Sequence, residues 1–281
     1  MNKYINLISY FGGKFPILKW LISKFPKGNY HFVDTMGGSG NVSLNVEYPL
    51  ITYNDVNNEV INLYNVLRND YEEFLRLVYF TPFSRSELNK IITDAINEVP
   101  LSDIERARRY FVKSQLGYGA NGSQNNHYGT GFEWKTQRSN FYRIDNWNIK
   151  LERLAKIVDK LRHFQIENRD ALELFDKINR KDVIAYFDPP YLLDLRKSKK
   201  RYTHEVDNDF HIRLSNKVKN AKCYVAISGY DHPLYDELFG SFYKSIAKIN
   251  RSNVGKIPQQ ECLWTNYDPE NHSNQLYIKF K

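Results

Sequence analysis

The stretch FVDTMGGSG, residues 32–40, starts as an apolar strand and continues into a glycine-rich turn. A helix start is predicted directly after it, over residues 41–44. Glycines let a backbone approach a ligand closely, and Asp34 could accept a hydrogen bond from a ligand ammonium group. A phosphate-binding Walker loop would end in Gly-Lys-Ser/Thr, an ending absent here. The pattern is typical of a nucleotide-binding α/β unit, although an ordinary strand-to-helix turn also uses glycine.

The next predicted strand, residues 50–54, ends at Asp55 and precedes a predicted helix over residues 56–68. An acidic residue at a strand end is well placed to bind both hydroxyls of a ribose. The alternative for Asp55 is the N-cap of that helix. The ribose role is favoured because the glycine-rich turn and the acidic strand end occur together. Asp170 presents a similar choice between contacting the adenine amine of a cofactor and capping a helix.

The tetrapeptide DPPY, residues 188–191, directly follows the apolar strand run 183–187. In an open α/β sheet, residues at this position face the ligand crevice, and each proline restricts the residue before it to extended conformations. If Asp188 and the Pro189 carbonyl each accept one hydrogen of an exocyclic amine, the nitrogen can pyramidalise and aim its lone pair at a sulfonium methyl group. Tyr191 would stack on the extruded base. The alternative is a strand-ending Pro-Pro turn with a packed tyrosine.

The predicted elements divide the chain into a core made of two separated segments and one insertion. Strands and helices alternate over residues 1–68 and again over residues 141–281, whereas residues 69–140 read as helices followed by a Gly/Asn-rich stretch. Helices are predicted over residues 71–80, 86–96, 103–115, 149–161, 171–178 and 210–220, and strands over residues 164–168, 182–188 and 223–228, followed by a C-terminal strand pair. The fold class is therefore α/β with an inserted, mainly helical domain.

The composition favours a soluble cytoplasmic protein with a polyanionic partner. The chain has 281 residues and a formal net charge of +8, which suits nucleic acid but also fits basic proteins that bind none. Its two cysteines, Cys223 and Cys262, lie in apolar runs, which favours free thiols in a reducing compartment. None of the seven histidines has a zinc-like spacing, so no metal is expected. No signal peptide or membrane-spanning run is predicted.

Several motifs, taken together and in order, resemble the Dam-type family of adenine-specific DNA methyltransferases over nearly the whole chain. The motifs are YFGGK (residues 10–14), FVDTMGGSG (32–40), YNDVN (53–57), DPPY (188–191), ISGYDHPLYDELF (227–239) and ECLWTNY (261–267). The resemblance implies a Rossmann-like core with helices on both sheet faces that uses S-adenosylmethionine (AdoMet). It also implies that residues 69–140 are the DNA target-recognition domain.

The resemblance assigns roles to individual residues. It implies that Asp34 and Lys14 hold the methionine end of AdoMet, with Asp55 on the ribose and Asp170 on the adenine amine. The resemblance implies that the target base is bound by Asp188, Pro189, Pro190 and Tyr191. Further expected cofactor contacts are Tyr10, Phe11, Gly12, Met36, Gly38, Gly40 and Asp188 itself. Met36 stands where the family usually has an aromatic residue, so altered cofactor affinity is expected rather than lost function.

Double-stranded DNA is the expected partner, and its candidate contacts lie in two polar segments. The Gly/Asn-rich stretch does not clearly reproduce the hairpin with which Dam reads GATC, so the target sequence stays open. Side chains suited to base edges or phosphates, or alternatively to a mobile polar loop, are Gln124, Asn125, Asn126, Arg138 and Arg143. The basic run after DPPY adds Lys197, Lys199, Lys200 and Arg201, with Tyr202 as a stacking surface and Lys14 as a further DNA contact.

Two rival functions remain compatible with the motifs. The same amine chemistry would serve cytosine in DNA or adenine in RNA, although the motif order argues against both. A catalytically silent DNA-binding regulator could keep the fold, but it would have no need of the intact Asp188, Pro189 and Tyr191. A cognate restriction endonuclease is a possible partner that the sequence does not settle.

Overall fold

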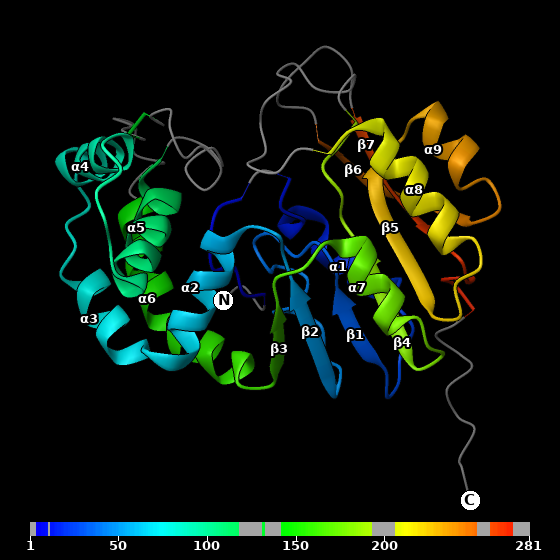
Figure 1. The fold of residues 1–281 in the computed structure, drawn as a ribbon, viewed down its shortest axis with the longest axis horizontal. Coiled ribbons are helices and arrows are strands. Elements are labelled where there is room, and N and C mark those ends of the chain that lie inside the picture. The colour runs from blue at the N-terminus through cyan, green and yellow to red at the C-terminus, as the bar shows by residue number, and fades with distance from the viewer. Residues whose placement is uncertain are drawn as a thin grey trace, which may run out of the picture.

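A seven-stranded sheet forms the centre of the described part of the computed structural model, which comprises residues 4–10, 12–117, 131–132, 142–192, 206–251 and 259–271. The strand order is β3-β2-β1-β4-β5-β7-β6 (Figure 1). The strands are β1 (His31–Asp34), β2 (Leu50–Asn54), β3 (Phe164–Glu167), β4 (Val183–Phe187), β5 (Tyr224–Tyr230), β6 (Tyr243–Arg251) and β7 (Gln259–Thr265). The first five strands run parallel, and β7 is antiparallel to both β5 and β6. The predicted strands and the C-terminal strand pair are confirmed.

The chain leaves β1 toward β2 on one side and returns to β4 on the other, so the strand order reverses at β1. Open α/β sheets bind ligands outside the carboxyl ends of the strands at such a reversal. The register aligns Asp34 with Tyr53 of β2 and with Tyr186 of β4. The residues that follow these strands therefore meet at one edge of the sheet.

Most helices lie close to the predicted ranges, but the sequence analysis did not predict η1, α1 or α9. They are η1 (Phe15–Ile17), α1 (Leu18–Ser23), α2 (Asn58–Asn69), α3 (Tyr71–Tyr79), α4 (Arg85–Ile96), α5 (Asp103–Leu116), α6 (Tyr142–Leu161), α7 (Ala171–Ile178), α8 (Asn208–Val218) and α9 (Pro233–Leu238). Short polar side chains cap many of their N-termini: Ser84, for example, accepts a hydrogen bond from the Glu87 amide and so begins α4.

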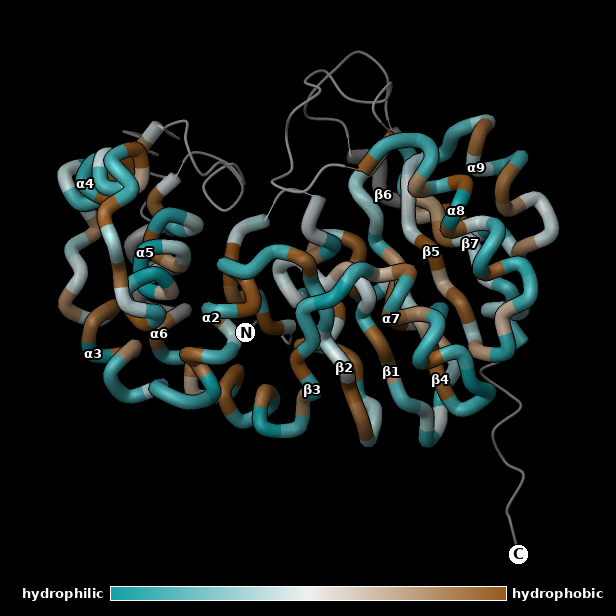
Figure 2. The backbone as a smooth tube through the Cα atoms, viewed as in Figure 1, coloured by the Kyte–Doolittle hydropathy of each residue, from teal (hydrophilic) through white to brown (hydrophobic). Residues whose placement is uncertain are grey.

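Helices cover both faces of the sheet, because alternate strand residues point to opposite sides. In β4, Ile184 and Tyr186 belong to the hydrophobic cluster under α1 and α2, whereas Ala185 and Phe187 belong to the cluster under α7, α8 and α9. The hydropathy colouring in Figure 2 shows brown, apolar segments along the strands and mixed colours along the outer helices. The predicted α/β fold is confirmed: a mixed sheet consistent with a Rossmann-like methyltransferase core.

Helices α3, α4 and α5 gather beyond the β3 edge of the sheet, at the left of Figure 1. They share one hydrophobic cluster with the sheet, which runs from Phe32 through α2 to Phe111 of α5. Trp147 of α6 belongs to this cluster, and its ring centroid lies 5.8 Å from that of Phe111 and 6.3 Å from that of Phe83. Helix α6, which begins before the predicted residue 149, therefore packs against Phe83 and against Phe111 of α5.

The helix start predicted over residues 41–44 is wrong. Residues 41–45 form turns, and α2, beginning at Asn58, is the next helix among the described residues. The Asn45 side chain explains the difference, because its amide accepts from the Ile5 backbone N–H and donates to the Ile5 carbonyl, each at 2.7 Å. These bonds tie the segment to the N-terminal strand-like residues, and Pro49 favours extended backbone just before β2.

Replacing Trp147 with alanine is expected to lower the free energy of unfolding by about 3–5 kcal/mol, because a buried indole is lost from the cluster that joins the helices to the sheet. Urea unfolding followed by circular dichroism measures this. The matched control is Ile96→Ala on exposed α4 surface, for which a change below about 0.5 kcal/mol is expected. A Trp147→Ala effect as small as that of the control would contradict the shared core.

Candidate active site

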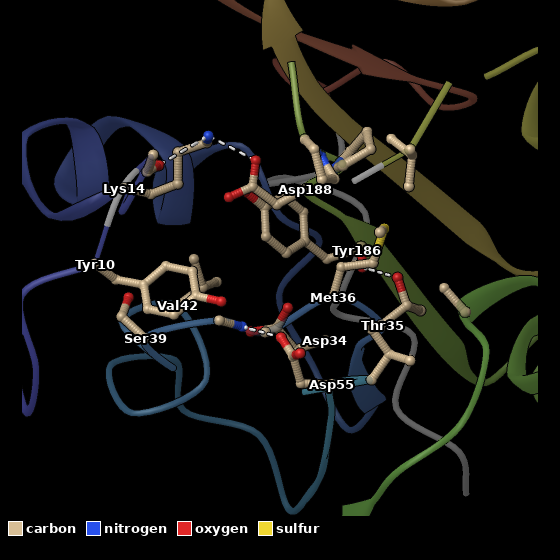
Figure 3. A pocket seen from close by; sticks show the side chains of 18 of the residues that line it. Tyr10, Lys14, Asp34, Thr35, Met36, Ser39, Val42, Asp55, Tyr186 and Asp188 are labelled. Carbon is tan, nitrogen blue, oxygen red and sulfur yellow. Dashed lines mark hydrogen bonds and ion pairs between the residues drawn. The ribbon is translucent and has the colours of Figure 1, made fainter. Parts of the chain in front are cut away.

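A cavity of about 680 Å³ opens at the carboxyl ends of the parallel strands. Acidic side chains at or after the ends of four neighbouring strands line it: Asp34 at the end of β1, Asp55 after β2, Asp170 after β3 and Asp188 after β4. Figure 3 shows Asp34, Asp55 and Asp188 around this space, with Lys14 reaching toward Asp188. The described structure thus brings together acids that are far apart in sequence.

Most of the predicted site residues within the described chain line this cavity. They are Tyr10, Gly12, Lys14, Asp34, Met36, Gly38, Asp55, Asp170, Asp188, Pro189 and Pro190. Gly40 and Tyr191 are described but do not belong to the lining. Phe11, Gln124, Asn125, Asn126, Arg138, Lys197, Lys199, Lys200, Arg201 and Tyr202 lie outside the described residues, and the side chain of Arg143 is likewise not described.

Two tyrosines fix the position of the glycine-rich loop. Tyr53 and Tyr64 stack with ring centroids 4.5 Å apart, and their hydroxyls donate to the carbonyls of Gly38 and Ser39. Gly40 has a φ of +65°, and a Cβ there would lie 1.9 Å from the Tyr64 hydroxyl oxygen. Glycine is therefore required at position 40 by both backbone conformation and packing.

The two oxygens of the buried Asp34 carboxylate differ in their hydrogen bonding. Its Oδ2 accepts a hydrogen bond from the Ser43 hydroxyl at 2.6 Å, whereas Oδ1 has no hydrogen-bond partner among the described residues. Burial raises the pKa of Asp34 to about 7; the Ser43 hydrogen bond opposes this, and the nearby Asp188 and Asp55 add to it. A cationic donor entering the cavity would satisfy Oδ1 and favour the ionised form.

Asp55 is anchored in the loop and is not a helix cap. Its Oδ2 accepts from the Gly38 amide at 2.7 Å, and its Oδ1 accepts from the Asn57 amide at 2.8 Å. The α2 N-cap is Asn57, whose side chain accepts from the Glu59 amide. The capping alternative for Asp55 is therefore wrong, and its carboxylate is fixed at the cavity that it lines.

Asp170 does cap a helix, and it also lines the cavity. Its Oδ1 accepts from the amides of Leu172 and Glu173, at 2.8 and 3.1 Å. The position of this turn is fixed by Asn54, whose buried amide donates to the carbonyls of Thr35 and Arg169. Asn54 thereby ties together the ends of β1, β2 and β3, a role that the sequence did not predict.

The Asp188 carboxylate is held from one side. Its Oδ1 lies 2.6 Å from the Lys14 ammonium nitrogen and accepts from the Ser228 hydroxyl at 2.8 Å. Ser228 is in turn 2.9 Å from the Tyr186 hydroxyl. The hydrogen bonds and ion pair of this carboxylate among the described residues all join Oδ1, so Oδ2 is the oxygen that could accept a hydrogen from a substrate.

Lys14 and Tyr191 have a partner that sequence reasoning missed, Glu261 of β7. Glu261 is fully buried, its Oε1 lies 3.0 Å from the Lys14 nitrogen, and the Tyr191 hydroxyl donates to its Oε2 at 3.1 Å. The only available signal was an acidic residue within the apolar segment ECLWTNY. The Tyr191 ring is buried and stacks on Tyr230 with centroids 3.9 Å apart. Stacking of a base on Tyr191 stays a prediction and would require a ring face to be uncovered.

Further cavity residues also escaped sequence analysis. Asn41 is buried, and its Oδ1 has no hydrogen-bond partner among the described residues. Phe210 and Arg213 of α8 complete the opposite wall. Their helical position was predicted, but nothing in the local sequence indicated that α8 would border the cavity.

The sequence was also compared with those of known proteins. Residues 10–254 match the D12 class N6 adenine-specific DNA methyltransferase family. This chain belongs to that family. The methyltransferase is 24% identical over 286 residues to the type II methyltransferase M1.LlaDCHI of Lactococcus lactis subsp. cremoris, covering 91% of this chain and 93% of that protein. It is 22% identical over 282 residues to the DNA adenine methylase of Salmonella typhi, covering 96% and 97%.

A shorter similarity links the methyltransferase to the DNA adenine methylase of Escherichia coli strain K12, at 30% identity over 76 residues and 27% of each chain. The family and these relatives bear out adenine-specific DNA methylation as the function. DNA is accordingly the substrate, and the rival readings as a cytosine or RNA methyltransferase are set aside.

Other sequence expectations concern compartment and metals. No helix in the described segments of the methyltransferase is long and apolar enough to cross a membrane. Within the same segments, no three His, Cys, Asp or Glu side chains are grouped as metal ligands, and the absence of a metal stays a prediction. Cys223 and Cys262 are free and buried, and burial raises the pKa of both thiols to about 12.

Replacing Asp34 with asparagine is expected to change how stability depends on pH. Because the folded pKa of about 7 exceeds the ordinary 3.8, the folded wild type keeps a proton that the unfolded chain has released. The retained proton stabilises the folded wild type by on the order of 4 kcal/mol in total. This stabilisation is complete below the ordinary pKa and is lost as the pH rises through the folded pKa. In urea unfolding, the free energy of unfolding of the variant relative to that of the wild type should rise with pH up to about pH 7 and stay constant above it. Parallel curves of unfolding free energy against pH for the variant and the wild type would contradict the raised pKa of Asp34.

Proposed function

We propose that the cavity binds AdoMet and that an adenine flipped out of duplex DNA meets it at the DPPY loop. The observation that supports this most strongly is the convergence of four strand-end carboxylates on one cavity, together with the buried Oδ1 of Asp34, which has no hydrogen-bond partner within the described ranges. A buried carboxylate oxygen of this kind needs a hydrogen-bond donor, and an ammonium group carries several.

The residues present fit AdoMet. The cavity volume of about 680 Å³ lies within the range of small-molecule sites. Asp34 and Asn41 offer buried acceptors for the methionine ammonium, Asp55 offers a carboxylate for the ribose hydroxyls, and Asp170 lies where an adenine amine could be recognised. When bound, AdoMet would supply an electrophilic methyl group on a sulfonium.

The chain's own contribution to catalysis is to orient the adenine amine. The amine nitrogen is a poor nucleophile because its lone pair is delocalised into the ring. Asp188 Oδ2 and the Pro189 carbonyl would each accept one amine hydrogen, which favours a pyramidal nitrogen with a directed lone pair. Once the nitrogen has gained the methyl group, it carries a positive charge and a readily lost proton. That proton would leave through Asp188 or water.

We assign residues 1–68 and 141–281 to the catalytic core and residues 69–140 to DNA target recognition. The described helices of this segment, α3, α4 and α5, lie beyond the β3 edge of the sheet (Figure 1). Phosphate contacts would come from the basic segment after DPPY, which carries Lys197, Lys199, Lys200 and Arg201. Tyr202 would add a stacking surface, and a cognate restriction endonuclease would be a separate partner.

Asp188→Ala is expected to lower the single-turnover rate of methyl transfer by roughly a thousandfold or more, because the amine loses its carboxylate acceptor. The AdoMet affinity should change little, since Asp34 and Asp55 remain. The measurement uses methyl-labelled AdoMet and adenine-containing duplex DNA, followed by hydrolysis to nucleosides. Label in N6-methyl-2′-deoxyadenosine that depends on Asp188 supports the proposal. Unchanged transfer in the variant, or no transfer by the wild type, would remove the proposed catalytic role.

Asp55→Asn is expected to weaken AdoMet binding by roughly tenfold, which corresponds to about 1.4 kcal/mol, because an uncharged amide accepts ribose hydroxyl hydrogens less strongly. Isothermal titration calorimetry with AdoMet and with adenosine should show the same loss for both ligands. Asp34→Asn serves as the contrast: it should weaken AdoMet, which has an ammonium group, but not adenosine. Equal effects of both substitutions on adenosine would contradict this division of roles.

A further inference from the structure

Glu261 is a fully buried ionisable residue of β7. It lies on β7, opposite Tyr230 of β5, and is followed by the buried Cys262, Leu263 and Trp264. Its exposed fraction is 0%, so its carboxylate is removed from water and must be compensated inside the protein. A buried ion pair is often no more stabilising than well-packed apolar residues in its place. Stability alone therefore gives weak grounds for a glutamate at this position.

The contacts of Glu261 lead directly to the DPPY loop. Its carboxylate binds the Lys14 ammonium at 3.0 Å and the Tyr191 hydroxyl at 3.1 Å. The same ammonium lies 2.6 Å from Asp188 Oδ1, and it also donates to the Tyr191 hydroxyl at 3.0 Å. Glu261 thus holds Lys14 and the far end of the DPPY loop in one arrangement.

The charges in this ion cluster, defined as Lys14, Asp188 and Glu261, do not cancel. One ammonium faces two carboxylates, so the field of Lys14 is divided between Asp188 and Glu261. An ammonium paired with Asp188 alone would withdraw more electron density from it and weaken Oδ2 as an acceptor. Because Lys14 and Ser228 both bind Oδ1, the orientation of Oδ2 also depends on where Lys14 is held.

We propose that Glu261 is a positioning residue for methyl transfer, which shares the charge of Lys14 and fixes it so that Asp188 presents Oδ2 to the adenine amine. This inference rests on the proposed role of Asp188 in accepting an amine hydrogen. In this proposal Lys14 holds the Asp188 carboxylate in position, in addition to any contact that it makes with cofactor or DNA.

The test is Glu261→Gln, which keeps the shape and an oxygen acceptor for Lys14 and Tyr191 but removes the charge. The single-turnover rate at saturating AdoMet and duplex DNA is expected to fall roughly 10- to 100-fold, the effect of a misplaced reacting group. Affinities for AdoMet and DNA should stay within a few-fold of wild type. Asp176→Asn is the control, because it removes one charge from an exposed ion pair with Lys217 and should leave the rate unchanged.

A double variant separates positioning from folding. Replacing both Lys14 and Glu261 with methionine removes the buried pair together, so stability should recover relative to Lys14→Met or Glu261→Met alone. Methyl transfer should stay slow in the double variant, because Asp188 has lost its ammonium. Recovery of transfer together with stability would overturn the inference, and so would an unchanged rate in Glu261→Gln.

The Asp188→Ala variant, assayed in parallel, keeps the two proposals apart. If Asp188→Ala abolishes transfer while Glu261→Gln retains it, the inference about Glu261 falls and the proposed function stands. If Asp188→Ala also retains transfer, the proposed role of Asp188 falls and the inference falls with it.

Discussion

The buried ammonium of Lys14 joins three segments that are distant in sequence. It meets Asp188 after β4, Glu261 in β7 and the Tyr191 hydroxyl at the end of the DPPY loop. Lys14 itself directly precedes η1, so this group joins the N-terminal segment to the strand ends. The position of the candidate catalytic carboxylate therefore depends on ion pairing across the fold as much as on the rigid proline backbone that follows it.

The acidic residues that line the cavity all lie at or after the ends of strands, but their surroundings differ. Asp34 is buried and has a raised pKa, and one of its oxygens has no partner in the part of the chain that the structure describes. Asp55 is tied by two backbone amides, and Asp170 caps α7. Asp188 is held by an ammonium and a hydroxyl. One sheet edge thus supplies carboxylates with different hydrogen-bonding capacity, which allows a single cavity to recognise an ammonium, hydroxyls and amines.

Sequence reasoning predicted the strands and most helices because their periodicity is strong and their caps are local. The strand-end acids were found for the same reason, since Asp34, Asp55 and Asp188 each follow an apolar run. It failed at residues 41–44, where the distant partner Ile5 of Asn45 decides the local structure. It also missed Glu261, whose importance comes from pairing with Lys14 across 247 positions of chain, a contact that no local pattern encodes.

Helix α6 leads into β3 with only residues 162 and 163 between them. Its Trp147 end packs against Phe111 of α5, and β3 is followed closely by the turn that carries Asp170. A shift of α5 relative to the sheet would therefore displace α6 and, through β3, the Asp170 turn at the rim of the cavity.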